Sequence, residues 1–269
     1  MQGCLGEKIG EGAMADVHAW APGQVIKLFK PGFRRRVGWW EAQMTRAVFA
    51  AGGPAPEVLD EVKLEGRRGI VMPRLHGPTL LQLLQADAIT PEAAGAILVD
   101  LGLAVHRTPP PQEALSLRDY MAASLRVAEP RLAEMIGGGL TELIDRLPTD
   151  EALSHCDLHP GNVIMTPGGP KLIDWTGTKR GGPPLDLACC HFLRTELAVQ
   201  ALGAPERQRA LHEAVQSEYA RRAGLCPAAL REAMEAHLPV ARAFFLLAGL
   251  ASSTLQARLL HRLQADLRD

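Results

Sequence analysis

The sequence predicts an α+β protein in which a small antiparallel sheet near the N-terminus is followed by a larger, mainly helical part. Three features of its 269 residues support this. The first 75 residues hold short apolar runs separated by turn residues, which is the pattern of β-strands. The residues after Pro78 form longer segments rich in Ala, Leu and Arg, which favour helices, and one pair of short apolar runs interrupts them near residue 165. We therefore expect an N-terminal domain over residues 1–75 and a helical domain over residues 76–269.

The N-terminal domain is expected to contain five strands and one helix. Apolar residues from Val37 to Val48 recur at helical spacing within Phe33–Ala51, and a Gly-Gly-Pro stop follows at 52–54. The helix therefore separates the third strand from the fourth. The expected strands are Leu5–Ile9, Val17–Trp20, Val25–Phe29, Val58–Leu64 and Gly69–Met72.

The C-terminal domain is expected to be helical with one hairpin. Thr90 followed by a proline opens a helix that runs to about His106. Val163–Met165 and Lys171–Ile173 flank a Pro-Gly-Gly-Pro turn and predict the hairpin. From Leu185 onward we expect three or four helices, the last of which carries Phe244, Leu247, Leu250, Leu255, Leu259 and Leu263 at helical spacing.

Composition and charge exclude several classes of protein. Lys and Arg number 29 against 30 Asp and Glu, so no general basic surface draws the chain to nucleic acid. The longest uncharged segment, Ala243–Ala257, is shorter than the roughly 18 residues that a membrane span needs. The N-terminus lacks a secretory signal, and the five cysteines form no C-x-x-C pair. We expect a cytoplasmic globular protein with free thiols that binds neither nucleic acid nor membrane.

The N-terminal domain carries residues suited to binding phosphate groups. Gly10 and Gly12 lie between two expected strands, where glycines let a hairpin backbone approach a phosphate chain, although ordinary turns share this pattern. Lys27 lies in the apolar strand 25–29, and a lysine on an apolar face needs a counter-charge. Glu41 in the following helix is the most economical partner, unless Lys27 reaches solvent. Such a pair holds the lysine toward phosphate oxygens in kinases.

The segment 154–162 carries the strongest signal for chemistry. It supplies Asp157 and Asn162, and Asp174 follows after the predicted hairpin. Asn162 and Asp174 suit Mg²⁺, which is held by few carboxylate and amide oxygens together with phosphate and water. Asp157 remains free to take or orient a hydroxyl proton. A zinc site is disfavoured because the spacing is poor between His155, Cys156, His159, Cys189, Cys190 and His191.

These motifs resemble those of the aminoglycoside phosphotransferase and choline kinase group, small-molecule relatives of the protein kinases. The resemblance spans most of the chain and rests on Gly10–Val17, Lys27 with Glu41, His155–Asn162, Asp174 and Pro184–Ala188. It implies a two-lobed protein kinase-like fold with the nucleotide between the lobes, and ATP or GTP with Mg²⁺ as cofactors. It also implies that Asp157 is the catalytic aspartate, that Asn162 and Asp174 hold Mg²⁺, and that His155 and Asp186 brace the loop. Thr176 departs from the relatives, which frequently have an acid there.

The same resemblance suggests how the adenine is held. The segment Val71–Leu75 would join the two lobes, with Met72 as the gatekeeper. The backbone carbonyl of Pro73 and the N–H of Leu75 would then contact the adenine edge. Proline suits the first position because it lacks only the N–H, which that position does not use.

Two features separate the chain from protein kinases. Only eleven residues lie between Asp174 and Asp186, too few for the long segment that docks a polypeptide, and no Ala-Pro-Glu triplet lies among them. About 45 residues, Pro109–Leu153, precede the catalytic loop and are expected to build part of the acceptor pocket.

The sequence therefore predicts a phosphotransferase that moves the γ-phosphate of a nucleotide to a hydroxyl of a small molecule. The acceptor is open among aminoglycosides, amino sugars, sugars and choline-like alcohols, as are the choice of ATP or GTP and the oligomeric state. The residues from Cys189 onward hold eight acids against ten arginines, unlike an anionic groove for a polycation. A compact protein kinase and a non-catalytic nucleotide-binding homologue are the alternatives. The complete set of Lys27, Asp157, Asn162 and Asp174 argues against the second.

Overall fold

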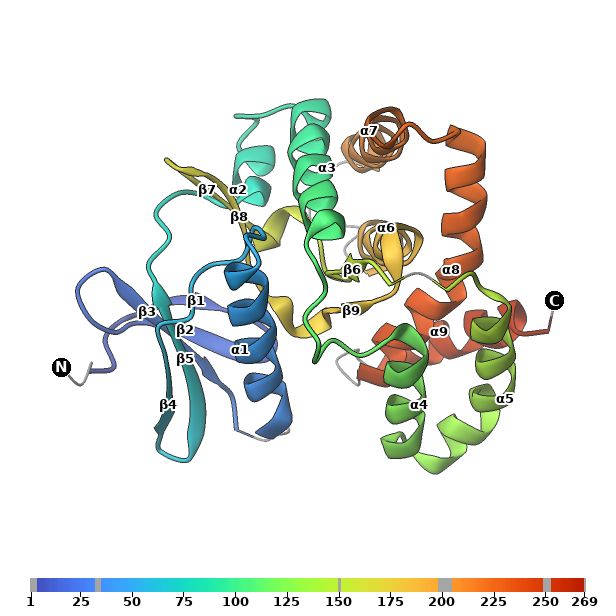
Figure 1. The fold of residues 1–269 in the computed structure, drawn as a ribbon, viewed down its shortest axis with the longest axis horizontal. Helices are drawn as coiled ribbons and strands as arrows, with labels where there is room; N and C mark the ends of the chain where they lie inside the picture. The colour runs from blue at the N-terminus through green and yellow to red at the C-terminus, as the bar shows by residue number, and fades with distance from the viewer. Residues whose placement is uncertain (1–3, 32–34, 150, 198–204, 249–252, 269) are drawn as a thin grey trace.

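The computed structural model describes residues 4–31, 35–149, 151–197, 205–248 and 253–268. Its N-terminal part is a five-stranded antiparallel sheet with the strand order β1-β2-β3-β5-β4, seen at the left of Figure 1. All five expected strands are present, with bounds shifted by a few residues. They are β1 (Lys8–Glu11), β2 (Ala15–Ala19), β3 (Gln24–Phe29), β4 (Asp60–Leu64) and β5 (Arg67–Pro73).

One helix, α1 (Arg35–Ala50), lies between this sheet and the rest of the molecule (Figure 1). Ala42 is buried with Phe29 of β3 in the small core under the sheet. Met44 and Val48 belong instead to the large core of the C-terminal part. Gly38 permits the close approach to the sheet, because a Cβ there would lie 2.8 Å from the Phe29 ring. The predicted helix is confirmed, and its expected first residue, Phe33, lies outside the described residues.

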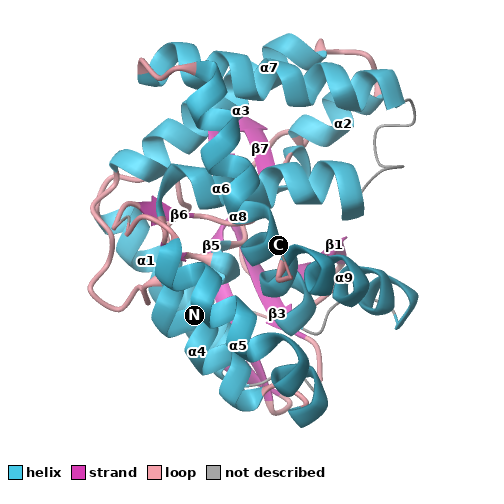
Figure 2. Cartoon of the chain, turned by 90° about the vertical axis from the view of Figure 1, so that its right-hand side faces the viewer, coloured by secondary structure: helices cyan, strands magenta, loops and turns pink. Residues whose placement is uncertain are grey.

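The C-terminal part is mainly helical, as predicted. Helix α3 packs along α7, and α6 packs along α8. In Figure 2, α3 and α7 lie next to each other at the top of the view. The helices are α2 (Leu80–Gln85), α3 (Pro91–Arg107), α4 (Leu117–Val127), α5 (Pro130–Arg146), α6 (Gly182–Phe192), α7 (Pro205–Ala223), α8 (Pro227–Ala248) and α9 (Ser253–Asp266), with a π-helical turn, η3 (Leu193–Leu197), after α6.

Local sequence signals explain where several of these elements begin. The Thr90 side chain accepts a hydrogen bond from the Ala93 N–H at 3.3 Å, and Pro91 occupies the first turn of α3. The segment 109–153, which precedes the loop 155–162, contains α4 and α5, and these two helices pack together. The apolar residues expected in one last helix are divided between α8 and α9, so that expectation was wrong; Leu250 lies outside the described residues.

Four short strands and two 3-10 turns bring chain segments to the junction between the two parts. The predicted hairpin is present as β7 (Val163–Thr166) and β8 (Gly169–Leu172). A second pair joins β6 (Leu153–Ser154) to β9 (Lys179–Arg180). The 3-10 turns are η1 (Pro160–Asn162), before β7, and η2 (Trp175–Gly177), after β8.

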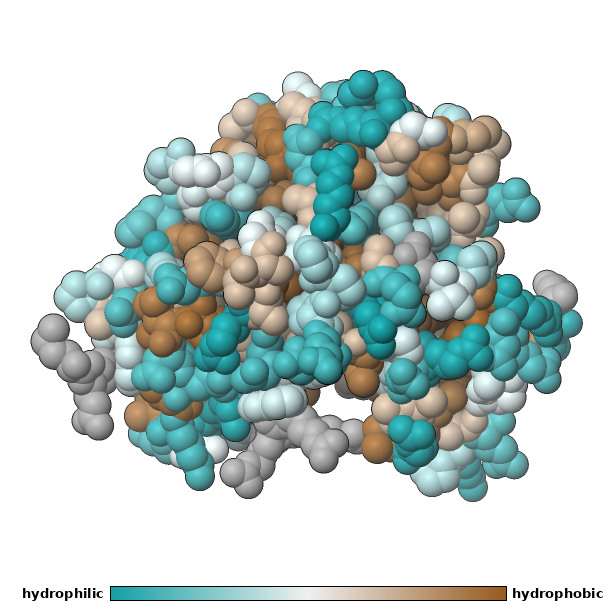
Figure 3. Space-filling model, viewed as in Figure 1, coloured by the Kyte–Doolittle hydropathy of each residue, from teal (hydrophilic) through white to brown (hydrophobic). Residues whose placement is uncertain are grey.

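The surface agrees with the mixed composition. The face in Figure 3 carries scattered apolar patches among hydrophilic residues. Among the described helices, none is long and apolar enough to cross a bilayer.

Candidate active site

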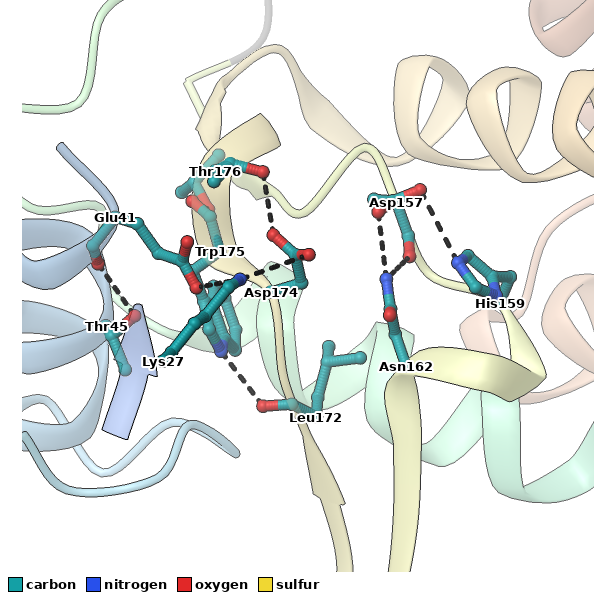
Figure 4. A network of polar contacts seen from close by, with 11 residues as sticks. Lys27, Glu41, Thr45, Asp157, His159, Asn162, Leu172, Asp174, Trp175 and Thr176 are labelled. Atoms are coloured by element: carbon teal, nitrogen blue, oxygen red, sulfur yellow. Dashed lines mark hydrogen bonds and ion pairs between the residues drawn. The ribbon is translucent and has the colours of Figure 1, made fainter. Parts of the chain in front are cut away.

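Lys27 connects the sheet to two carboxylates from other elements. Its Nζ lies 2.6 Å from Oε1 of Glu41 on α1 and 3.2 Å from Oδ2 of Asp174, which follows β8 (Figure 4). The backbone of Glu41 accepts a hydrogen bond from Thr45 Oγ1 at 2.7 Å. The side chains of Lys27 and Glu41 are 12% and 4% exposed, so this ion pair is largely removed from water.

Burial and charge oppose each other in this cluster. Burial alone would lower the pKa of Lys27, but the carboxylates of Glu41 and Asp174 outweigh it and hold the pKa above its ordinary value. Burial raises the pKa of Glu41 to about 7 against the attraction of Lys27, and repulsion from Asp174 adds to the rise. Lys27 is therefore a fixed ammonium group at neutral pH.

The hairpin β7–β8 has Asn162 directly before its first strand and Asp174 two residues after its second. Val163 pairs with Leu172, so the residues just outside the hairpin face each other, and the Ile173 N–H donates to the Asn162 carbonyl at 2.9 Å. Asp174 then adopts a left-handed backbone with a φ of 65°, and its Oδ1 accepts from Thr176 Oγ1 at 2.8 Å. The carboxylate is thereby turned toward Lys27 (Figure 4).

Asn162 also links this corner to Asp157. Its Nδ2 donates to Oδ2 of Asp157 at 2.8 Å and to the Asp157 backbone carbonyl at 3.0 Å. His159 Nε2 lies 3.7 Å from the other Asp157 oxygen (Figure 4). Burial lowers the pKa of His159, which favours its neutral form.

The two aspartates have pKa values that are pushed apart. Burial and the negative charge of Asp174 raise the pKa of Asp157 well above its usual range. Burial acts on Asp174 in the same direction, but Lys27 and the Thr176 hydroxyl outweigh it and lower the pKa of Asp174. Asp174 therefore carries a fixed negative charge, and Asp157 is the carboxylate better suited to accept a proton.

Asp186 accepts hydrogen bonds from the backbone of the two residues before Asp157. The N–H groups of His155 and Cys156 donate to the two Asp186 oxygens at 3.2 and 2.7 Å, and His106 Nε2 lies 3.0 Å from Oδ2. The Tyr219 hydroxyl adds to this series of hydrogen bonds, since it lies 2.7 Å from the other ring nitrogen of His106. These contacts fix the loop that presents Asp157.

His155 supports the same loop from within the core. Its Nδ1 accepts the Asp157 N–H at 3.2 Å, and its ring packs edge-on against Trp175. Burial lowers the pKa of His155 to about 4, so the ring is neutral at pH 7.

The glycine loop and the lobe junction lie on the same sheet as Lys27. In the strand register, Gly10 faces Val17, which in turn faces Lys27, while Gly12 lies in the turn and donates its N–H to the Ala15 carbonyl at 2.8 Å. Lys27 pairs with Ile70 of β5. Pro73 is the last residue of that strand, three residues beyond Ile70, and Leu75 comes two residues after Pro73. At about 3.3 Å per residue, Pro73 lies ~10 Å along the sheet from Lys27.

The donor set at this corner fits Mg²⁺ and not zinc. Asp174 offers a carboxylate to a metal ion. The side-chain nitrogen of Asn162 donates to Asp157, so its side-chain carbonyl oxygen can point to the metal ion. Within the described part of the chain, no three His, Cys, Asp or Glu side chains converge on one point as a metal site.

Sequence reasoning missed two buried cations close to this loop. Arg194, on η3, is 6% exposed, and its Nε has no hydrogen-bond partner among the described residues. It lies beside Cys190, whose thiol donates to the Leu158 carbonyl at 3.0 Å. Lys179, on β9, is 1% exposed. The sequence around each of these residues has no apolar alternation that would predict burial, because both side chains are buried by contacts between segments that are distant in the sequence.

Comparisons with known proteins agree with this geometry. The model of the phosphotransferase enzyme family matches residues 25–225, about three quarters of the chain. No curated protein matches the sequence.

Solved structures share the whole fold at low identity. A choline/ethanolamine kinase family protein from Mesorhizobium loti is 18% identical with a TM-score of 0.61, over 98% of this chain and 87% of that one. Aminoglycoside phosphotransferase APH(3'')-Id from Streptomyces rimosus, with ADP and streptomycin, is 18% identical with a TM-score of 0.56, over 86% and 90%. A GDP and kanamycin complex of APH(2")-IIIa is 13% identical with a TM-score of 0.59, over 97% and 92%. The architecture is thus the two-lobed protein kinase-like fold.

Proposed function

The chain belongs to the phosphotransferase enzyme family, and we propose on this basis that it transfers the γ-phosphate of ATP or GTP, with Mg²⁺, to a hydroxyl group of a small molecule. A single observation carries the proposal. Lys27 with Asp174 and Asp157 with Asn162 form two contact pairs that draw on both lobes, and the pairs lie near enough for the charge of Asp174 to raise the pKa of Asp157 (Figure 4). Phosphoryl transfer needs such a set, since catalysis depends mainly on positioning and charge neutralisation.

The N-terminal lobe would bind the nucleotide. The Lys27 ammonium group, fixed by Glu41, would contact the phosphates, and the backbone at Gly10 and Gly12 would cover them. Pro73 and Leu75 would contact the base. The ~10 Å along the sheet between Lys27 and Pro73 gives room for the ribose between base and phosphates.

The C-terminal lobe would hold the metal and the acceptor. Asn162 and Asp174 would hold Mg²⁺, which when bound neutralises charge on the phosphate oxygens. Asp157 would accept or orient the acceptor's hydroxyl proton, assisted by its raised pKa. Asn162 would keep the Asp157 carboxylate in place through the bond at 2.8 Å.

The short connection after Asp174 favours a small acceptor over a protein. Turn η2, strand β9 and the start of α6 use almost all residues between Asp174 and Asp186. The residues that bind a polypeptide in protein kinases have no place in this connection. Aminoglycosides, amino sugars, sugars and choline-like alcohols are the candidate acceptors.

The experiment is a panel of hydroxylated metabolites and aminoglycosides assayed for ADP or GDP release with Mg²⁺ and each nucleotide. The Asp157→Asn variant provides the background rate. Acceptor-dependent release that the variant lacks would support the proposal. Phosphate found on a protein would favour a protein kinase, and nucleotide binding without turnover on any acceptor would favour a non-catalytic homologue.

A further inference from the structure

The two ring nitrogens of His159 have different surroundings. Nδ1 accepts the Gly161 N–H at 3.1 Å and so caps the turn η1. A ring nitrogen that accepts a hydrogen bond carries no proton, so in the neutral ring the proton lies on Nε2. Among the described residues, the contact of Nε2 is with Asp157 at 3.7 Å, which is longer than a hydrogen bond. Nε2–H is therefore a donor that the fold leaves without an acceptor.

The surroundings of His159 keep its ring neutral. Burial lowers the pKa of His159, and the nearby Arg194 charge adds to this against the opposing carboxylate of Asp174. The neutral ring can accept at Nδ1 and donate at Nε2 at the same time.

The backbone at Gly161 fixes where the ring lies. A Cβ at this position would lie 2.9 Å from Cε1 and 3.0 Å from Nδ1 of His159. Any other residue at 161 would have to displace the ring, so glycine is needed here for a close approach. The ring is thereby held against the turn, with Nε2 on the side of Asp157.

The donor faces the Asp157 oxygen that Asn162 leaves free. Asn162 donates to Oδ2 at 2.8 Å, whereas Oδ1 is the oxygen 3.7 Å from Nε2 of His159. One oxygen atom of a ligand can lie within hydrogen-bond distance of both Nε2 and Oδ1. The side chains of His159 and Asp157 are 34% and 26% exposed, so a molecule from solution can reach both.

His159 lies away from the corner that would hold the phosphates. In Figure 4, Lys27 and Asp174 lie to one side of Asp157 and His159 lies to the other. On the proposed function the phosphates and the metal ion occupy the first side. The side with His159 is then the one that the acceptor meets.

We infer that His159 is a second residue that contacts the reacting group of the acceptor: its Nε2–H donates to the acceptor's hydroxyl oxygen while Oδ1 of Asp157 accepts the hydroxyl proton. The inference rests on the proposed function. One lone pair of the hydroxyl oxygen accepts from His159, and the other forms the bond to the γ-phosphorus. The bond from phosphorus to the bridging oxygen breaks, its electron pair leaves with the nucleoside diphosphate, and the proton goes to Asp157. Two contacts thus fix the direction of the attacking lone pair.

The main test shortens the side chain and keeps the cap. In His159→Asn the amide oxygen can still accept the Gly161 N–H, but the side chain ends short of Asp157. We expect kcat/KM for each acceptor found in the panel to fall roughly tenfold, with a raised KM for the acceptor. The Kd of the non-hydrolysable nucleotide AMP-PNP or GMP-PNP and the melting temperature should stay at the parental values. His159→Gln, whose amide nitrogen can reach the place of Nε2, should recover part of the loss. The control is His261→Asn, at an exposed histidine on α9, which should match the parent.

A second test moves the ring without replacing it. The methyl group in Gly161→Ala displaces the ring, so kcat/KM for the acceptor should fall as it does in His159→Asn. In the His159→Asn background the same methyl group should have little further effect, because no ring is left to displace. Losses that add up in the double variant would overturn the inference. If His159→Asn does not fold, Gly161→Ala alone is the test, and a parental kcat/KM contradicts the inference.

The outcomes separate this inference from the proposed function. A parental kcat/KM for the acceptor in His159→Asn overturns the inference and leaves the phosphotransferase intact. A loss matched by an equal weakening of AMP-PNP or GMP-PNP binding would place Nε2–H on the phosphates and overturn the acceptor contact. If no acceptor turns over in the parent, the proposed function fails and the inference fails with it.

Discussion

The Nζ of Lys27 lies 3.2 Å from Oδ2 of Asp174, and this contact joins the two lobes through a strand of one and a loop of the other. The same ammonium group is held at 2.6 Å by Glu41 of α1. Strand β3, helix α1 and the segment after β8, which are distant in the sequence, thus meet at the Lys27 ammonium group. On the proposed function, a nucleoside triphosphate bound there would compete with Asp174 for Lys27, and nucleotide binding would then be coupled to the relative position of the lobes.

Replacing Lys27 by Met should reduce both activity and stability. Removing one charged donor from phosphate oxygens is expected to lower kcat/KM for the nucleotide by roughly 10²- to 10³-fold. It also leaves Glu41 buried without its partner, which destabilises a protein by about 3–5 kcal/mol when the charge is retained. Steady-state ADP release and urea unfolding measure the two effects.

The double variant Lys27→Met with Glu41→Gln separates these effects. It removes the unpaired buried carboxylate, so the free energy of unfolding should return toward that of the parent while turnover stays low. Recovery of turnover together with stability would show that Lys27 acts only as a structural partner of Glu41.

The Asp157→Asn variant should lose turnover and keep nucleotide binding. An amide cannot accept the hydroxyl proton, so kcat is expected to fall on the order of 10²- to 10⁴-fold. The asparagine retains an oxygen that can still accept from Asn162, and the loop should keep its shape. Asp145→Asn, at an exposed ion pair on α5, is the matched control. Equal turnover in Asp157→Asn and the parent would refute the assignment.

Asp174→Asn should change the requirement for Mg²⁺. Loss of the carboxylate weakens a hard-cation site, so the Mg²⁺ concentration that gives half-maximal turnover is expected to rise by at least roughly tenfold. The measurement is a Mg²⁺ titration at saturating nucleotide. Asp100→Asn, an exposed residue on α3, should leave the titration unchanged. A variant with the parental Mg²⁺ dependence would place the metal elsewhere.

Local patterns in the sequence were sufficient to predict the parts of the site that depend on short-range structure. Strand alternation placed Lys27 on an apolar face, and Glu41 was the one acid in the next helix. The hairpin predicted between Asn162 and Asp174 is present, so the two residues flank it as expected, and the meeting of their side chains around a metal ion stays a prediction. The order of strands and helices in the N-terminal lobe follows from the same periodicities.

The parts that depend on distant packing could not be predicted. Tyr120 and Phe244 meet over Lys179 only because α4 and α8 are adjacent in the fold, and no local pattern encodes that adjacency. Helical spacing also continued from α8 into α9, so periodicity alone predicted one helix there. Arg194 was counted only as one positive charge, whereas the structure buries it beneath the loop.

The left-handed backbone of Cys156 provides a test of loop strain. This buried residue has a φ of 62°, a region that favours glycine and costs other residues roughly 1–2 kcal/mol. Cys156→Gly should therefore lie close to the parent in unfolding free energy, since relief of strain offsets the lost thiol packing. Cys156→Val adds a branched Cβ and should destabilise by at least about 2 kcal/mol and lower turnover through Asp157. Urea unfolding of Cys156→Gly and Cys156→Val measures the two effects, and equal free energies of unfolding in the two variants would contradict the prediction.

Acid should destabilise the protein through a pair of half-buried histidines. His191 Nδ1 and His212 Nε2 lie 3.0 Å apart, and Arg194 lies 3.5 Å from the other nitrogen of His212. Burial, reinforced by the Arg194 charge, lowers the pKa of His191 to about 4 and that of His212 to about 3. In the unfolded chain both rings titrate near pH 6.5.

Between pH 6.5 and about 4 the unfolded chain therefore binds protons that the folded protein does not, so the free energy of unfolding falls as the pH falls through this window. Urea unfolding at pH values from 7.5 to 4.5 measures the slope. The double variant His191→Gln with His212→Gln should show a shallower slope, with the remainder due in part to His155. Arg194→Met should also flatten it, because the histidines then lose a repelling charge. If the double variant keeps the parental slope, acid acts elsewhere in the molecule and this pair is not its target.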